Sequence, residues 1–413
     1  TVGGDRIEYK GKLATPTSHL TTIKIHLNSV VSTPGAKYGT ADISNFYLGT
    51  PLDTFEYMRI NIRDIPDEII RRYNLMPLVH NGFVMVEIRK GMYGLPQAGI
   101  LANNRLQKHL REHGYVAVPH TPGLFKHVTR SILFTLVVND FGIKYINKCD
   151  WEHLLHVLKL KYDITSDISG SLYCNLKLVW DYKKRHVDVS MPDYVKKALV
   201  KYSHITSSRP QHSPYQFTKP HYTSEPQWAE PLTSSPLLST IEKKRLERVI
   251  GTLLYYGKAI DNTILVPVGT LASQQSQATQ STYRSLSQLL DYLGTHPDAS
   301  IRYNASDMIL WVHSDASYLS VPKARSRAGR HFFLSTRPKD GTPLSQCPLN
   351  GPIHVISKII KNVMSSAAEA KIGAGYINAR EALPIRVCLE KNGHPQLPTP
   401  LTVDDTTAVS FTK

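Results

Sequence analysis

The stretch Ser131–Tyr145, SILFTLVVNDFGIKY, constrains the fold of this chain more than any other part of the sequence. Two apolar runs flank the polar pair Asn139-Asp140, and this pattern predicts a β-hairpin with the acidic residue at its tip. An isolated Asn-Asp pair is also an ordinary turn signal, so the hairpin alone indicates no chemistry. Its function depends on what the rest of the chain brings to the tip.

Two further motifs precede this hairpin in the chain. TADISNFYLGTP runs from Thr40 to Pro51 and KGMYGLPQAGI from Lys90 to Ile100, and a short strand over 38–41 is expected to lead into Asp42. In this order the three stretches resemble the palm of a reverse transcriptase, and their residues are closest to those of copia-type LTR retrotransposons. With the later part of the chain, the resemblance covers nearly all 413 residues.

The resemblance implies an α+β fold of the right-hand polymerase class, with fingers, palm and thumb. In that family three carboxylates converge on two Mg²⁺ ions, and the matching positions here are Asp42, Asn139 and Asp140. The Ile43 carbonyl is a further metal ligand by the same analogy. The family has Asp where this chain has Asn139, and a neutral amide is a poorer ligand, so we expect a rate loss of roughly 10³-fold.

Two side chains are expected to contact the incoming deoxynucleoside triphosphate. Tyr47 follows Asp42 by five residues, the spacing of the family's steric gate, whose ring excludes a ribose 2′-hydroxyl; a lone tyrosine would more often belong to a core. Pro96 ends a strand, and a helix that stops at Gly114 is predicted after it. Gln97 therefore lies near a helix N-terminus, which favours a triphosphate, and in the family the matching Gln contacts the nucleotide; the alternative is a solvated side chain.

The segment after the hairpin is predicted to continue as a helix, two strands and a second helix. Asp150 is expected to cap the first helix, and the strands SLYCNLKLVWDY and RHVDVSM resemble the palm edge that grips a primer terminus. The family usually has Gly at Asn175. The second helix, from Pro192, carries lysines that suit a phosphate backbone or are only solvated: Lys196, Lys197 and Lys201.

Changes in composition divide the chain into three expected parts. Residues 1–190 would form fingers and palm, and residues 191–305 would form thumb and connection, with a Pro/Ser-rich linker at 207–236. Two amphipathic helices are expected in the middle part, around Leu246–Leu254 and Leu286–Leu293. Residues 306–413 return to strands and form the third part.

The third part is predicted to have the element order strand, strand, strand, helix, strand. Its strands are MILWVHSD, GRHFFLS, PIHVISK and LTVD, and its helix begins at about Ser366. Asp315, Glu369 and Asp404 stand where ribonuclease H has acids, so the segment resembles that family and implies a second two-Mg²⁺ site. Because strand side chains alternate, Asp404 and not Asp405 should face the site. The family's fourth acid would lie beyond Lys413, so we expect a truncated domain.

The charge balance points to a nucleic-acid partner. Lys+Arg number 49 against 33 Asp+Glu, a net charge of +16 with a pI near 9.5, which suits a polyanion. No apolar run approaches the roughly 20 residues of a membrane span, so no membrane partner is expected. Four scattered cysteines indicate neither a zinc site nor a disulfide framework, and a reducing compartment is the default.

Two functions follow from the resemblance. The first is an RNA-directed DNA polymerase with attached ribonuclease H, impaired by Asn139, acting on an RNA template, a DNA primer and their RNA–DNA hybrid. The second is a catalytically inactive remnant that still binds nucleic acid. The resemblance also implies a segment of a longer polyprotein in a cytoplasmic virus-like particle. An unrelated basic α/β protein would need all these motifs to coincide.

Overall fold

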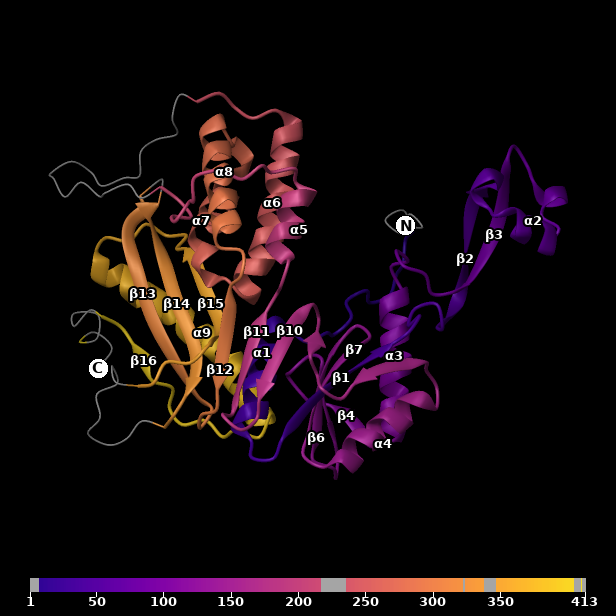
Figure 1. Ribbon diagram of the computed structural model, residues 1–413, viewed down its shortest axis with the longest axis horizontal. Helices are drawn as coiled ribbons and strands as arrows, with labels where there is room; N and C mark the ends of the chain where they lie inside the picture. The colour runs from indigo at the N-terminus through magenta and orange to yellow at the C-terminus, as the bar shows by residue number, and fades with distance from the viewer. Residues whose placement is uncertain (1–6, 217–234, 322–323, 338–346, 405–409, 411–413) are drawn as a thin grey trace. The chain divides into compact units, whose positions relative to one another are not determined.

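The structure is a computed structural model that describes residues 7–216, 235–321, 324–337, 347–404 and 410 (Figure 1). It divides into two compact units. The first unit comprises Thr1–Ser18 and Tyr38–Ser169, and the second comprises His19–Lys37 and Gly170–Lys413. The described residues contain no helix that is long and apolar enough to cross a membrane.

The first unit is built on a six-stranded sheet in the order β4-β5-β6-β7-β1-β8, with α3 and α4 beside it (Figure 1). Both helices bury one apolar face in the same core as the strands, because their apolar residues recur at helical spacing. The elements are β1 Lys37–Ile43, α3 Ala98–Glu112, β4 Tyr115–Ala117, β5 Leu124–His127, β6 Ile132–Val137, β7 Asp140–Tyr145, α4 Lys148–Lys159 and β8 Ile164–Asp167.

A separate two-stranded ribbon completes the first unit. β2 Pro51–Asn61 pairs antiparallel with β3 Phe83–Lys90, and α2 Asp67–Arg72 lies between them in the chain, flanked by the 3-10 turns Ile62–Asp64 and Met76–Leu78. The side chains of α2 and of both turns are not buried, so this loop is exposed.

Two sequence predictions in the first unit assign an aspartate to the wrong position, one in the hairpin and one in the helix α4. Val137 pairs with Asp140, so Val138 and Asn139 form the hairpin turn and Asp140 opens β7 instead of lying at the tip. The turn can close there because Val138 adopts a φ of +59°. Asp150 does not cap α4: the cap is Asn147, and Asp150 is the third helical residue, held 2.9 Å from Arg130.

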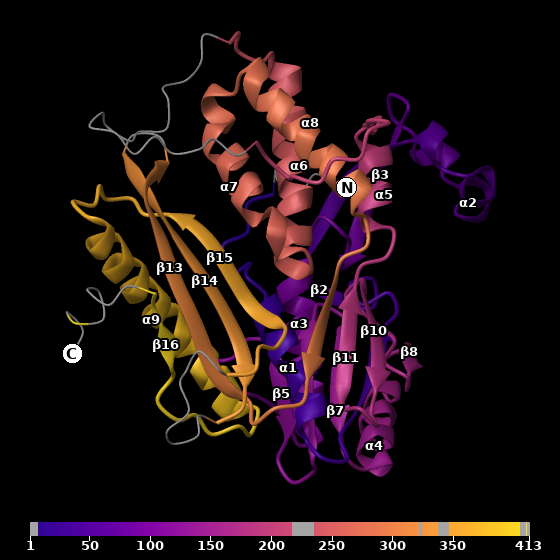
Figure 2. The ribbon, with the colours of Figure 1, turned by 60° about the vertical axis from the view of Figure 1, so that its left-hand side comes forward.

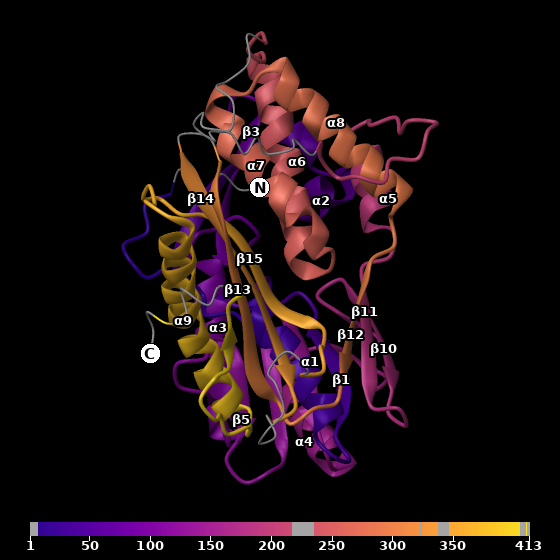
Figure 3. The same ribbon diagram turned by 90° about the vertical axis from the view of Figure 1, so that its left-hand side faces the viewer.

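The second unit contains a four-stranded sheet in the order β12-β11-β10-β9 and a group of helices (Figure 3). The elements are α1 Leu20–Ser32, β9 Leu172–Tyr173, β10 Leu176–Asp181, β11 His186–Ser190, α5 Tyr194–Lys201, α6 Thr240–Ala259, the 3-10 turns Asn262–Ile264 and Gln275–Gln277, α7 Leu265–Gln274, α8 Gln280–Thr295 and β12 Ser300–Asn304. Most of the expected linker, residues 217–234, lies outside the described residues.

The helix α7 is absent from the sequence prediction. Pro267 does not interrupt this helix, because it is the third helical residue, where a backbone N–H has no intrahelical partner to lose. The turn between β9 and β10 shows why Asn replaces the family's Gly: Cys174 and Asn175 have φ of +49° and +64°, and Asn tolerates this region better than most residues.

The rest of the second unit is a four-stranded sheet in the order β15-β14-β13-β16. Its elements are β13 Ile309–Val321, β14 Arg325–Ser335, β15 Pro352–Ile359, α9 Ala367–Lys391 and β16 Leu401–Thr402. Figure 2 shows α9 on one side of the sheet and α7 on the other. The predicted element order is confirmed, but the last strand ends at Thr402, so Asp404 lies beyond it, and Asp405 is outside the described residues.

Candidate active site

The sheet of the first unit brings Asp42 and Asp140 together although 98 positions separate them (140 minus 42). Asp42 is the penultimate residue of β1 and Asp140 is the first residue of β7, and these strands are neighbours in the sheet. The Ile43 N–H donates to the Asn139 carbonyl over 3.2 Å, which fixes the end of β1 against the hairpin turn. Both carboxyl groups therefore lie at one end of the sheet.

Asp140 perturbs Asp42. Partial burial, the charge of Asp140 and a side-chain hydrogen bond to it together raise the pKa of Asp42 to about 6. Like charges at such close range favour protonation of one member unless a cation offsets them. A pair of carboxylates held this closely is the type of ligand set that Mg²⁺ prefers.

Asn139 changes what this pair can do. Its side-chain Nδ2 donates to the Asp42 carboxylate and, over 3.1 Å, to the Ile43 carbonyl. These two oxygens are the predicted metal ligands, and a carboxylate at position 139 could not donate to them. A cation at this site could therefore be bound only by the two aspartates and the Ile43 carbonyl. The Asn139 amide would first have to rotate its N–H donor away from these oxygens.

Tyr47 and Gln97 flank the first turn of α3. The half-buried Tyr47 ring meets Tyr93 edge-on at 5.1 Å, and a Cβ built on Gly99 in α3 would lie 3.7 Å from the Tyr47 hydroxyl. Gln97 is buried at the N-cap of α3, and its Nε2 donates to Glu56 over 2.8 Å. The Gln97 Oε1 is buried without a hydrogen-bond partner among the described residues.

The structure also identifies residues that the sequence reasoning missed. Glu56 on β2 accepts from Gln97, and no local pattern could pair residues 41 positions apart. In the second unit, Lys371 on α9 contacts both Asp315 and Asp404. A lysine in the otherwise small-residue run AAEAKIGAG was the available signal for this contact.

The second predicted set of acids is only partly assembled. Asp315 in β13 and Asp404 after β16 converge on Lys371, whereas the Glu369 carboxylate accepts two hydrogen bonds from Ser365 at 2.5 and 2.6 Å. Across the described ranges, no three His, Cys, Asp or Glu side chains are grouped so that they could hold a metal ion. Neither predicted site therefore presents three acids around one point.

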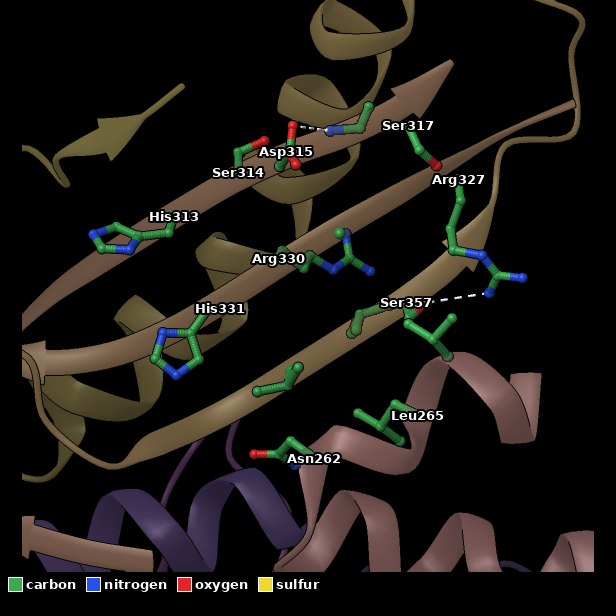
Figure 4. Close-up of a pocket in the computed structure, with 15 residues that line it drawn as sticks. Asn262, Leu265, His313, Ser314, Asp315, Ser317, Arg327, Arg330, His331 and Ser357 are labelled. Carbon is green, nitrogen blue, oxygen red and sulfur yellow. Dashed lines mark hydrogen bonds between the residues drawn. The ribbon is translucent and has the colours of Figure 1, made fainter. Parts of the chain in front are cut away.

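A pocket of about 410 Å³ lies between the start of α7 and the face of the second unit's sheet opposite α9 (Figure 4). His313 and His331 project into it from adjacent strands, with ring centres 6.3 Å apart. Burial lowers the pKa of His331 to about 4, so it is neutral at pH 7. Arg327 donates to Ser357 and to Thr270, each over 3.1 Å, so its guanidinium is already engaged.

Comparison with known proteins finds sequence similarity to a putative transposon protein. The chain is 23% identical over 291 residues, 69% of its length, to a Saccharomyces cerevisiae protein named for the transposon Ty5-1, and the match covers 89% of that protein. This similarity supports a relationship to retroelement proteins. No protein-family model matches the chain.

A comparison with solved structures finds a foamy viral protease–reverse transcriptase in complex with an RNA/DNA hybrid. The TM-score is 0.48 at 12% sequence identity. The similarity covers 97% of this chain and 42% of the viral chain, so this chain spans less than half the length of that neighbour.

Proposed function

We propose that the chain is the reverse transcriptase segment of a copia-type LTR retrotransposon, with an attached ribonuclease H-like domain. The observation that carries the proposal is the approach of Asp42 and Asp140 from neighbouring strands, which contributes to the raised pKa of Asp42. The similarity to the Ty5-1 protein supports the retroelement part of the proposal. The copia-type assignment rests on the motifs at Thr40–Pro51 and Lys90–Ile100.

The proposed reaction adds a deoxynucleotide to a DNA primer on an RNA template. Bound Mg²⁺ would supply activation of the primer 3′-hydroxyl and stabilisation of the leaving pyrophosphate. Asp42, Asp140 and the Ile43 carbonyl would hold it. Tyr47 would exclude a ribose 2′-hydroxyl by its bulk, and Gln97, at the N-cap of α3, would contact the nucleotide.

Asn139 is the reason to expect a slow polymerase. Its amide donates to Asp42 and Ile43 in the absence of metal, and it brings no charge when a cation binds. Loss of one organising carboxylate is worth several kcal/mol, or roughly 10³-fold in rate. The same observation favours a second candidate, an inactive remnant that binds nucleic acid through its net charge of +16.

Binding and extension measured on one duplex separate these two candidates. The full chain should bind a poly(rA)/oligo(dT) hybrid, with an affinity that falls at least a hundredfold between about 50 and 200 mM salt. Slow, Mg²⁺-dependent extension that Asp140→Asn abolishes would support the polymerase. The matched control is Asp53→Asn, an exposed acid on β2.

Three results are possible in this experiment. Extension lost only in Asp140→Asn assigns polymerase activity to the pair of acids. Tight binding without extension in any variant assigns the inactive remnant. Failure of the folded chain to bind the hybrid would contradict both candidates.

A further inference from the structure

The register of the second unit's sheet brings Asp315 and Asp404 to the same level. β16 runs parallel to β13, and His313 pairs with Thr402. Asp315 and Asp404 each lie two residues further along the chain, so they reach the same end of neighbouring segments. Both carboxylates are largely exposed, at 68% and 69%.

The side chain between these acids is Lys371, the fifth residue of α9. Its Nζ lies 3.5 Å from Asp315 Oδ1 and also bonds Asp404 Oδ1. Lys371 is only 15% exposed, so its aliphatic stem is packed while its ammonium reaches both acids. These contacts raise the pKa of Lys371 and lower that of Asp404, as expected for a charged bridge.

Glu369, the third acid expected at this site, accepts hydrogen bonds at the start of α9 and does not join the two aspartates. Its carboxylate accepts from the Ser365 N–H and hydroxyl, while its own N–H donates to Ser366 at the N-cap of α9. These hydrogen bonds lower the pKa of Glu369 and hold it in the helix cap. The position that faces the two aspartates from α9 is 371 and not 369.

We propose that the Lys371 ammonium takes the place of a divalent cation between Asp315 and Asp404. The residues present do not fit the metal that a ribonuclease H resemblance implies, because a cation entering between the acids would meet a fixed positive charge within a few ångströms. The ribonuclease H-like domain is thus closed to metal, independently of the lesion at Asn139. Its sheet and helix remain intact as a scaffold.

Replacing the lysine tests this inference through metal binding. Lys371→Glu places a third carboxylate where the ammonium now lies, so the variant should bind one more Mn²⁺ ion than the starting chain. Its affinity for this ion should be at least tenfold higher than that of any weak Mn²⁺ site in the starting chain. Electron paramagnetic resonance titration counts the bound Mn²⁺. The matched control is Lys391→Glu, the same charge change at the exposed last residue of the same helix, about 30 Å away at 1.5 Å per residue.

A second variant covers the case in which Lys371→Glu does not fold. Lys371→Met removes the charge but keeps the packed stem, and it should also gain Mn²⁺ binding, more weakly than a three-acid site. The inference is overturned if folded Lys371→Glu or Lys371→Met binds no more Mn²⁺ than Lys391→Glu. It is also overturned if the starting chain already binds a Mn²⁺ that Asp315→Asn removes. The Mn²⁺ titration does not depend on primer extension, so the test of this inference is separate from the test of the polymerase proposal.

Discussion

Asn139 donates hydrogen bonds to two of the oxygens that the proposed site would use to bind a cation. An amide that donates to Asp42 and to the Ile43 carbonyl offsets part of the charge that a cation would otherwise balance. The offset is incomplete, because the pKa of Asp42 still rises to about 6. Ionised Asp42 therefore lowers the free energy of unfolding at neutral pH, and stability measurements can detect this effect.

Asp42→Asn should stabilise the first unit at pH 8. The pKa of Asp42 is about 6 in the folded chain against its ordinary value of 3.8, so the folded state binds the extra proton between these values. Stability from the protonated form is complete below about pH 4 and is lost as the pH rises through 6. The substitution should gain about 1 kcal/mol at pH 8, allowing for solvent screening, and little at pH 4.

Urea unfolding at the two pH values measures this difference, with Asp53→Asn as the exposed control. An equal effect of Asp42→Asn at pH 8 and pH 4 would show that the two acids do not repel each other in the folded chain.

At the scale of single elements, the hairpin turn between β6 and β7 carries local strain next to the site. Val138 is β-branched and has a φ of +59°, a region that such residues rarely adopt. It also packs partly against the core of the first unit, so a simple deletion would mix strain and packing. Strain of this kind often accompanies functional positions.

Comparing Gly with Ala at this turn isolates the strain. Both substitutions remove the two γ-methyl groups that pack, but only Gly adopts positive φ without cost, so Val138→Gly should be more stable than Val138→Ala by about 1 kcal/mol. At Val137, within the β6 ladder, the order should reverse, because Gly weakens a strand. Equilibrium unfolding of the four variants checks this, and the same order at both positions would refute the strained turn.

The elements also show how far sequence reasoning reaches. The strands and α3 were predictable because apolar periodicity, Pro96 and Gly114 are local signals. The helix α1 was not, since it buries polar residues such as Lys24 and His26 whose partners lie far along the chain. Its Lys24 donates to the Lys258 carbonyl over 2.8 Å, and burial lowers the Lys24 pKa to about 7.

The two candidate sites also differ in how much of each could be predicted from the sequence. Asp42 and Asp140 could be paired because the order of the sequence motifs resembles that of the reverse transcriptase palm, although 98 positions separate the two residues. The exchange of Glu369 for Lys371 could not, because residues two positions apart on a helix face different directions and the helix start decides which one meets the sheet. Side-chain donors such as that of Asn139 are likewise visible only in three dimensions.

At the scale of the whole molecule, each unit has a pair of aspartates in which at least one carboxylate accepts from a side-chain nitrogen. Asn139 supplies that donor in the first unit and Lys371 supplies it in the second. Substitution at either position changes the net charge of +16 by no more than two units, because Lys371 contributes one positive charge and Asn139 contributes none. We therefore expect catalysis and nucleic-acid binding to respond separately to substitution, with catalysis sensitive to these two residues and binding sensitive to salt.

Primer extension by Asn139→Asp tests the central claim most directly. The substitution restores a carboxylate of almost the same shape, so Mg²⁺-dependent extension of oligo(dT) on poly(rA) should rise by roughly 10³-fold. Hybrid affinity at fixed salt should stay within a few-fold. The matched control, Asn147→Asp at the exposed N-cap of α4, should leave extension at the starting level. If folded Asn139→Asp binds the hybrid and extends no faster than Asn147→Asp, Asn139 does not limit the reaction and the polymerase account is contradicted.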